Sequence, residues 1–148
     1  MKRSRRLEPV VKVAESREQQ AARSLGESQS ALNLAQQRLN ELKNYREEYI
    51  QRFHTTGAVG MSAAQMGDYR LFLGNLARAI EEQAGLVKQA AAAVEQQRQQ
   101  WFARRGKVKM LGNVVSRFQT EEQRVADRKE QLEQDERSQR MPASSSRS

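Results

Sequence analysis

The residue types that carry most enzyme chemistry are scarce in this sequence. There is one histidine, His54, and there is no cysteine. A metal site usually needs several imidazole or thiolate ligands, and a catalytic triad needs a histidine between a nucleophile and an acid. Paired carboxylates such as Glu47 with Glu48 point to different parts of a helix surface. The eight glycines form no phosphate-binding loop, so we predict no catalysis, no metal site and no cofactor.

One group of residues has a spacing that suits binding. Its members recur at intervals of three and four, which places them on one stripe of each of two helices. More apolar residues are present there than a two-helix seam can bury, and exposed apolar patches with aromatic anchors commonly mark protein contacts. The alternative is that these rings wrap the seam and belong to the core. The stripe residues are Leu42, Tyr45, Tyr49, Phe72, Leu76 and Ala79.

A second group is basic. The net charge is +8, yet the segments 7–54 and 63–103 each carry equal numbers of acidic and basic residues. The excess lies mainly in residues 1–6 and 104–117, which an antiparallel hairpin would bring together at its open end. Such a cluster attracts an acidic protein surface, a phosphate backbone or an anionic membrane. The basic candidates are Lys2, Arg3, Arg5, Arg6, Arg104, Arg105, Lys107 and Lys109.

The elements that position both groups are long helices. The chain has 148 residues, of which 37% are hydrophobic and only 5% aromatic, which is too lean for an ordinary globular core. Strand-like alternation is missing, and Gln, Glu, Arg, Lys, Ala and Leu dominate, as in helices that bury a narrow seam. We find neither an apolar run long enough to span a bilayer nor a signal peptide, and the lack of cysteine suits the cytosol.

Two periodic segments predict the helix bounds. Apolar residues alternate at spacings of four and three from Leu7 to Phe53, and again from Leu73 to Leu132, as in a coiled-coil seam. We therefore expect one hairpin domain over 7–136, with helices over 7–54 and 63–136 and a turn over 55–62. Residues 1–6 are expected to form a basic arm. Residues 137–148, which are rich in serine, are expected to be disordered.

The turn is predicted from its residue types. Gly57 and Gly60 each weaken a helix by about 1 kcal/mol. Ser62, followed three residues later by Gln65, is a capping box that starts a new helix.

A bend centred in this turn sets the register between the two helices. It places Leu42 level with Leu76 and Leu7 level with Leu111. The second helix is the longer one, so its residues beyond Leu111 are expected to lack an internal partner.

Several stretches resemble the FliJ family of the bacterial flagellar type III export apparatus. They are LKNYREEY at 42–49, YRLFLGNLARAIEEQ at 69–83, a tryptophan followed by a basic run from 101, and DRKEQLEQDE at 127–136. The length and the basic start also match. The resemblance implies an antiparallel coiled coil similar to the paired helices of the gamma stalk in rotary ATPases.

The resemblance also implies partners and sites. Members of this family insert into the ring of the export ATPase FliI and promote its assembly and activity, contact the export gate protein FlhA, and bind export chaperones. Residue by residue, the gate-facing set matches the stripe residues named above, whereas Arg38 and Gln83 depart from the expected Gln and His. The implied role is non-enzymatic support of flagellum biogenesis, motility and chemotaxis, in the cytoplasm and loosely at the inner face of the cell membrane.

Two other functions fit the composition. A basic coiled coil could associate with nucleic acid, although rings are not interleaved with the basic clusters as stacking platforms require, so no specific nucleic acid is expected. A homodimeric export chaperone is the other alternative. It would show a doubled mass in sedimentation.

Overall fold

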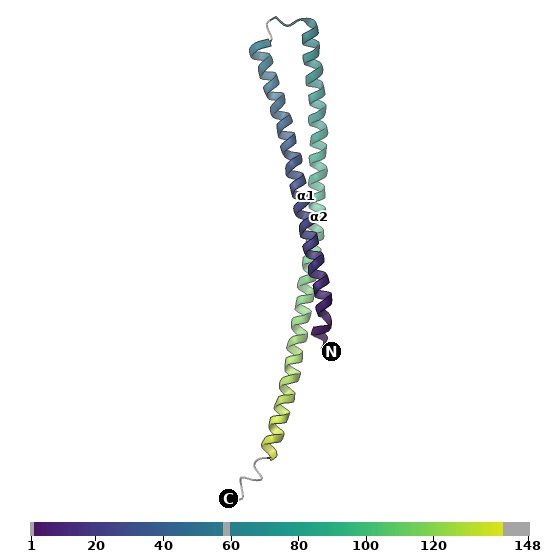
Figure 1. The fold of residues 1–148 in the computed structure, drawn as a ribbon, viewed down its shortest axis with the longest axis vertical. Coiled ribbons are helices and arrows are strands. Elements are labelled where there is room, and N and C mark those ends of the chain that lie inside the picture. The colour runs from purple at the N-terminus through teal and green to yellow at the C-terminus, as the bar shows by residue number, and fades with distance from the viewer. Residues whose placement is uncertain (1, 58–59, 141–148) are drawn as a thin grey trace. The chain divides into compact units, whose positions relative to one another are not determined.

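The fold consists of two long helices joined by a short turn. In this computed structural model, which describes residues 2–57 and 60–140, α1 spans Arg3–Arg52, the π-helical turn η1 spans Phe53–Gly57, and α2 spans Ala63–Arg140 (Figure 1). No strand occurs within these two ranges. The predicted all-α helical hairpin is confirmed.

The first helix begins earlier than predicted. It starts at Arg3 rather than Leu7, so most of the expected basic arm is helical. The backbone N–H and the Oγ of Ser4 donate to the Glu122 carboxylate at 3.1 and 2.7 Å. Two further backbone N–H groups of the first turn donate to the Lys2 carbonyl. These bonds satisfy groups that a helix start leaves without an intrahelical partner, so the helix extends to the basic residues.

The other helix ends also differ by a few residues. α1 ends at Arg52 rather than His54, where η1 takes over. α2 continues to Arg140 rather than Glu136, because its last turns contain good helix formers and no glycine or proline. Arg137 and Arg140 in the last turn also interact favourably with the helix dipole. The remainder of the predicted tail, 141–148, lies outside the described residues.

The start of α2 has the predicted capping box. The Gln65 N–H donates to Ser62 Oγ at 3.1 Å, and the Ser62 N–H donates to Gln65 Oε1 at 3.0 Å. Gly60 has a φ of 101°, in the region that residues with a Cβ rarely adopt. The turn therefore needs glycine at this position, and the cap then fixes where the second helix starts.

The helices divide into two compact units. Unit 1 contains Met1–Gln19 and Ala103–Ser148, and unit 2 contains Gln20–Phe102. In each unit a segment of α1 packs antiparallel against a segment of α2.

The core of unit 2 follows the predicted seam. Leu39, Leu76 and Ile80 form a buried cluster, and Leu42 and Phe72 pack against it. Gln83 is a polar residue at a seam position. Its Nε2 donates a hydrogen bond to the Ala35 carbonyl at 3.0 Å, so this polar group has a partner within the seam. The predicted register near the bend is consistent with this cluster.

The register in unit 1 differs from the prediction. Because Ser4 bonds to Glu122, Leu7 lies level with residues near Gln119 rather than with Leu111. Leu111 is buried, at 9% exposure, and so is Ala14 at 6%. The prediction was wrong because it extrapolated one register from the turn along the whole of α1. Ala21 and Ser28, at seam positions of α1, have small side chains. Small side chains make small knobs, so they do little to fix the register between the two helices.

Burial shows where the seam ends on α2. The α2 residues that follow the alternating spacing of three and four from Leu73 are buried or partly buried as far as Glu122, except Arg104. From Gln123 to Arg140 every residue is exposed. α2 therefore loses its partner about three turns later than Leu111, the predicted point. We call residues 123–140 the overhang.

Replacing a seam residue should cost far more stability than replacing an exposed neighbour. Leu76 is 7% exposed and Leu71 is 63% exposed. We expect Leu76→Ala to lower the free energy of unfolding by about 2–5 kcal/mol, as for other buried leucines, and Leu71→Ala to change it by less than about 0.5 kcal/mol. Urea denaturation followed by circular dichroism measures both. Equal effects would contradict the assignment of the seam.

Candidate protein-binding surfaces

Aromatic rings from both helices form one cluster in unit 2. Tyr49 lies 4.3 Å from Phe72 and 5.4 Å from Tyr69, measured between ring centres. Phe53 stacks on Tyr69 at 3.9 Å, and Tyr45 meets Phe72 edge-on at 5.9 Å. Such pairs contribute about 0.5–1.5 kcal/mol each beyond their buried area. We call these five residues the ring cluster.

The six predicted stripe residues lie close together but differ in burial. Leu76 is part of the buried core, and Leu42 packs against that core. Tyr49 and Phe72 are partly buried, and Tyr45 is 47% exposed. The core interpretation therefore applies to the leucines, and the contact-surface interpretation applies to the rings. The leucines lie on the inner side and support rings whose outer edges reach the surface. A partner would touch Tyr45 most extensively.

Two members of the ring cluster, Tyr69 and Phe53, are not among the predicted stripe residues. Tyr69 stacks between Tyr49 and Phe53 and so connects the predicted rings to the turn. Its spacing could have revealed it, because Tyr69 lies three residues before Phe72 and shares its helix face. Phe53 is the first residue of η1. The sequence pattern places it at the end of the predicted seam of the first helix.

The eight basic candidates are all exposed, but the two basic clusters lie at different levels of unit 1. The Arg3 guanidinium carbon lies 5.7 Å from the centre of the Phe118 ring, within the range of a cation–π contact. Within the basic segment 104–117 of α2, Arg117 is the neighbour of Phe118 and so lies level with the start of α1, whereas Lys109 lies nine residues before Phe118, a rise of roughly 14 Å. The start of α1 therefore lies beside the end of this segment, and the corrected register carries residues 2–6 past residues 104–109.

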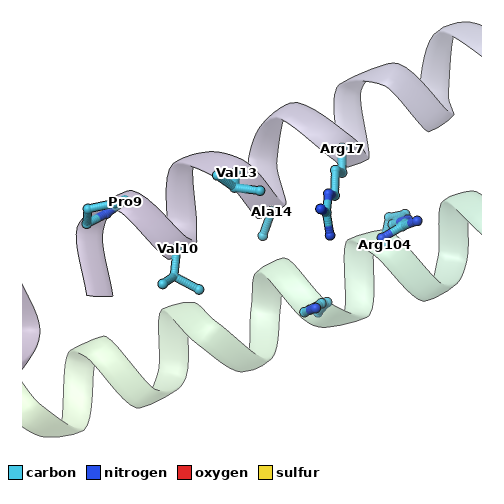
Figure 2. A pocket seen from close by; sticks show the side chains of 7 residues that line it. Pro9, Val10, Val13, Ala14, Arg17 and Arg104 are labelled. Atoms are coloured by element: carbon cyan, nitrogen blue, oxygen red, sulfur yellow. The ribbon is translucent and has the colours of Figure 1, made fainter. Parts of the chain in front are cut away.

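A groove of unit 1 combines apolar walls with positive charge. Its volume is about 280 Å³. Figure 2 shows the side chains of Val10, Val13 and Ala14 on α1, with Arg17 and Arg104 from opposite helices at one end. Val10 and Val13 are 46% and 51% exposed. We call this the basic groove; its lining residues are Pro9, Val10, Val13, Ala14, Arg17, Arg104 and Lys107.

One carboxylate of unit 1 has an altered acidity. The hydrogen bond from the Ser4 side chain, followed by that from the Ser4 backbone, lowers the pKa of Glu122. The positive charge of Lys2 acts in the same direction, and partial desolvation opposes it. The charged form of Glu122 is therefore the one that holds the first turn of α1 against α2.

The described residues hold no group of three or more histidine and acidic side chains that could bind a metal ion. Within the same residues, no helix is long and apolar enough to cross a membrane.

The structure defines the class of protein: a helical hairpin with a coiled-coil seam, a ring cluster in one unit and excess positive charge in the other. Comparison with known protein families assigns the chain to one of them. Residues 2–147 match the family described as flagellar FliJ protein, so the chain belongs to the FliJ family and is a component of the flagellar export apparatus. No curated protein and no solved structure matches. The family resemblance of the sequence is thus confirmed.

Acid should weaken the attachment of the α1 start. Because Ser4 lowers the folded-state pKa of Glu122 below its unfolded value, the stabilisation is complete at neutral pH. It is lost as the pH falls through the lowered, folded-state pKa. Carboxyl-carbon NMR should show Glu122 titrating below the usual range of a glutamate carboxyl, and Ser4→Ala should raise the Glu122 midpoint. Identical midpoints in both proteins would contradict the bond.

Proposed function

We propose that this chain is a non-catalytic stalk that links the ATPase ring FliI to the export gate FlhA. The observation that carries the proposal is the separation of charge from rings. Unit 1 carries seventeen basic and ten acidic residues, a net charge of +7, while unit 2 carries nine and eight, a net charge of +1. Seven of the eight aromatic residues are in unit 2. Each unit thus suits a different neighbour.

The basic unit suits an acidic protein surface such as the lumen of a ring. Several exposed cations on one unit raise the rate of encounter with an acidic partner and set its orientation. Nucleic acid would use the same charge, but binding single strands also needs rings on which bases stack. Phe118 is the one aromatic residue of unit 1, which favours the protein partner.

The ring cluster suits an apolar partner surface. Tyr is enriched at interface hot spots because it presents a large rigid ring and a polar hydroxyl. Leu42 and Leu76 would act indirectly, by holding the rings from the core side. We infer that this surface meets the gate, at the inner face of the cell membrane, and that export chaperones bind the same protein. Any contact with lipid would be loose and made through exposed cations.

The ATPase ring tests the first half of the proposal. We expect the purified chain to raise the rate of ATP hydrolysis by its cognate ring. A variant with Arg104→Glu and Lys107→Glu should activate less, because two charges that face the acidic partner are reversed. A matched control, Arg38→Glu with Lys43→Glu, changes the same charge in unit 2 and should activate normally. An unchanged rate at saturating protein would refute the link to the ring.

Tyr45 tests the second half. Tyr45→Ala removes an exposed ring at the rim of the cluster, so helicity should remain while binding to the cytoplasmic domain of the gate weakens by about 1–2 kcal/mol, roughly five- to thirtyfold. Titration calorimetry measures this, and swimming in soft agar should decline in parallel. Leu71→Ala is the control for loss of an exposed apolar residue. Equal binding by the Tyr45 variant and the parent chain would remove the ring cluster from the gate contact.

A further inference from the structure

The basic groove lacks a partner among the described residues, and its chemistry specifies what it accepts. Val10 and Val13 are about half exposed on its walls. Arg17, Arg104 and Lys107 add three positive charges, and they come from both helices (Figure 2). A concave apolar surface flanked by cations fits a helix with an apolar residue between carboxylates. A matching occupant would lower both the exposed apolar area and the repulsion among the cations.

The overhang of this same chain has that composition. Residues 130–136 include four acidic and no basic residues. Leu132 is 64% exposed, although it continues the seam of α2. Glu136 lies one turn beyond Leu132 on the same side of the helix, and Glu133, three residues before Glu136, lies on the flank of that side. The overhang therefore presents an apolar side chain with two carboxylates beside it.

The overhang cannot reach the basic groove of its own chain. Lys107 and Leu132 are on one continuous helix, and their separation of 25 positions along the chain corresponds to roughly 38 Å. A second copy has no such restriction. We infer that the basic groove of one copy binds the overhang of another, with Leu132 against Val10 and Val13, and with Glu133 and Glu136 near the three cations.

The positions along α2 allow both copies to dock at once. The α2 wall of the groove, at Arg104 and Lys107, and the overhang residue Leu132 lie at nearly equal distances from Gln119. Two α2 helices that run antiparallel about an axis near Gln119 therefore place each overhang beside the partner's groove. This is a closed two-fold dimer, in which the contact between basic groove and overhang occurs twice, once in each direction. The pairing would be reversible because its ion pairs are exposed to solvent and screened by salt.

Pairing covers the basic groove in both copies. An acidic partner that uses Arg104 and Lys107 would then compete with the second copy. Self-association thus provides a way to keep the basic unit occupied until that partner is present. The inference does not depend on the proposed link between ring and gate, since it concerns the chain alone.

Sedimentation equilibrium of the full chain tests the pairing. At about 0.1 M salt we expect the mass to approach twice the monomer value as concentration rises. At about 1 M salt, where the Debye length falls to roughly 3 Å, we expect the monomer. Glu133→Lys with Glu136→Lys should weaken self-association at least tenfold without changing helicity. A monomer at every concentration in low salt would overturn the inference.

Charge reversal and cross-linking identify the surfaces. Adding Arg104→Glu and Lys107→Glu to the lysine variant restores opposite charges and should restore the dimer. Glu47→Lys with Glu48→Lys makes the same charge change in unit 2 and should leave the dimer intact. The chain has no cysteine, so Val13→Cys with Leu132→Cys should form an intermolecular disulfide, unlike Val13→Cys alone. A dimer that survives the lysine variant, or that the charge reversal does not restore, would show a different interface.

Discussion

Two helices that pack only on each other can bury no more than one stripe of each. The buried apolar residues of the described chain are correspondingly few: Ala14, Leu39, Leu76, Ile80, Val94 and Leu111. A narrow seam does not exclude polar residues completely, provided that each finds a hydrogen-bond partner. Gln83 and Glu122 both do, and no buried polar side-chain atom in the described residues is left without a partner.

The same narrow contact leaves most of each helix available to other molecules. Side chains beside the seam can be apolar, because the neighbouring helix covers about half of their surface. The ring cluster occupies such positions near the turn, and the basic groove occupies them in unit 1. Function in this fold therefore resides in residues adjacent to the seam, which is why Tyr45 and Val13 are exposed while Leu76 and Ala14 are buried.

Prediction from sequence succeeded where the signal is local. The capping box of Ser62 and Gln65 depends on residues three apart, and the seam depends on spacings of three and four, so both could be recognised without knowledge of the partner helix. The start of α1 was misplaced because its cap is not local. It comes from Glu122, which is distant in sequence and is brought close only by the packing of unit 1.

The sequence alone thus determined the helical class, the position of the turn, the seam and the family. Tertiary structure decided the register in unit 1, the inclusion of Tyr69 and Phe53 in the ring cluster, and the joining of Arg17 to Arg104 and Lys107 around an apolar groove. The reason is physical. Helix periodicity follows from the geometry of one chain segment, whereas register depends on how side chains of two segments fit together. A shift of one or two turns leaves the periodicity unchanged and replaces every contact across the seam.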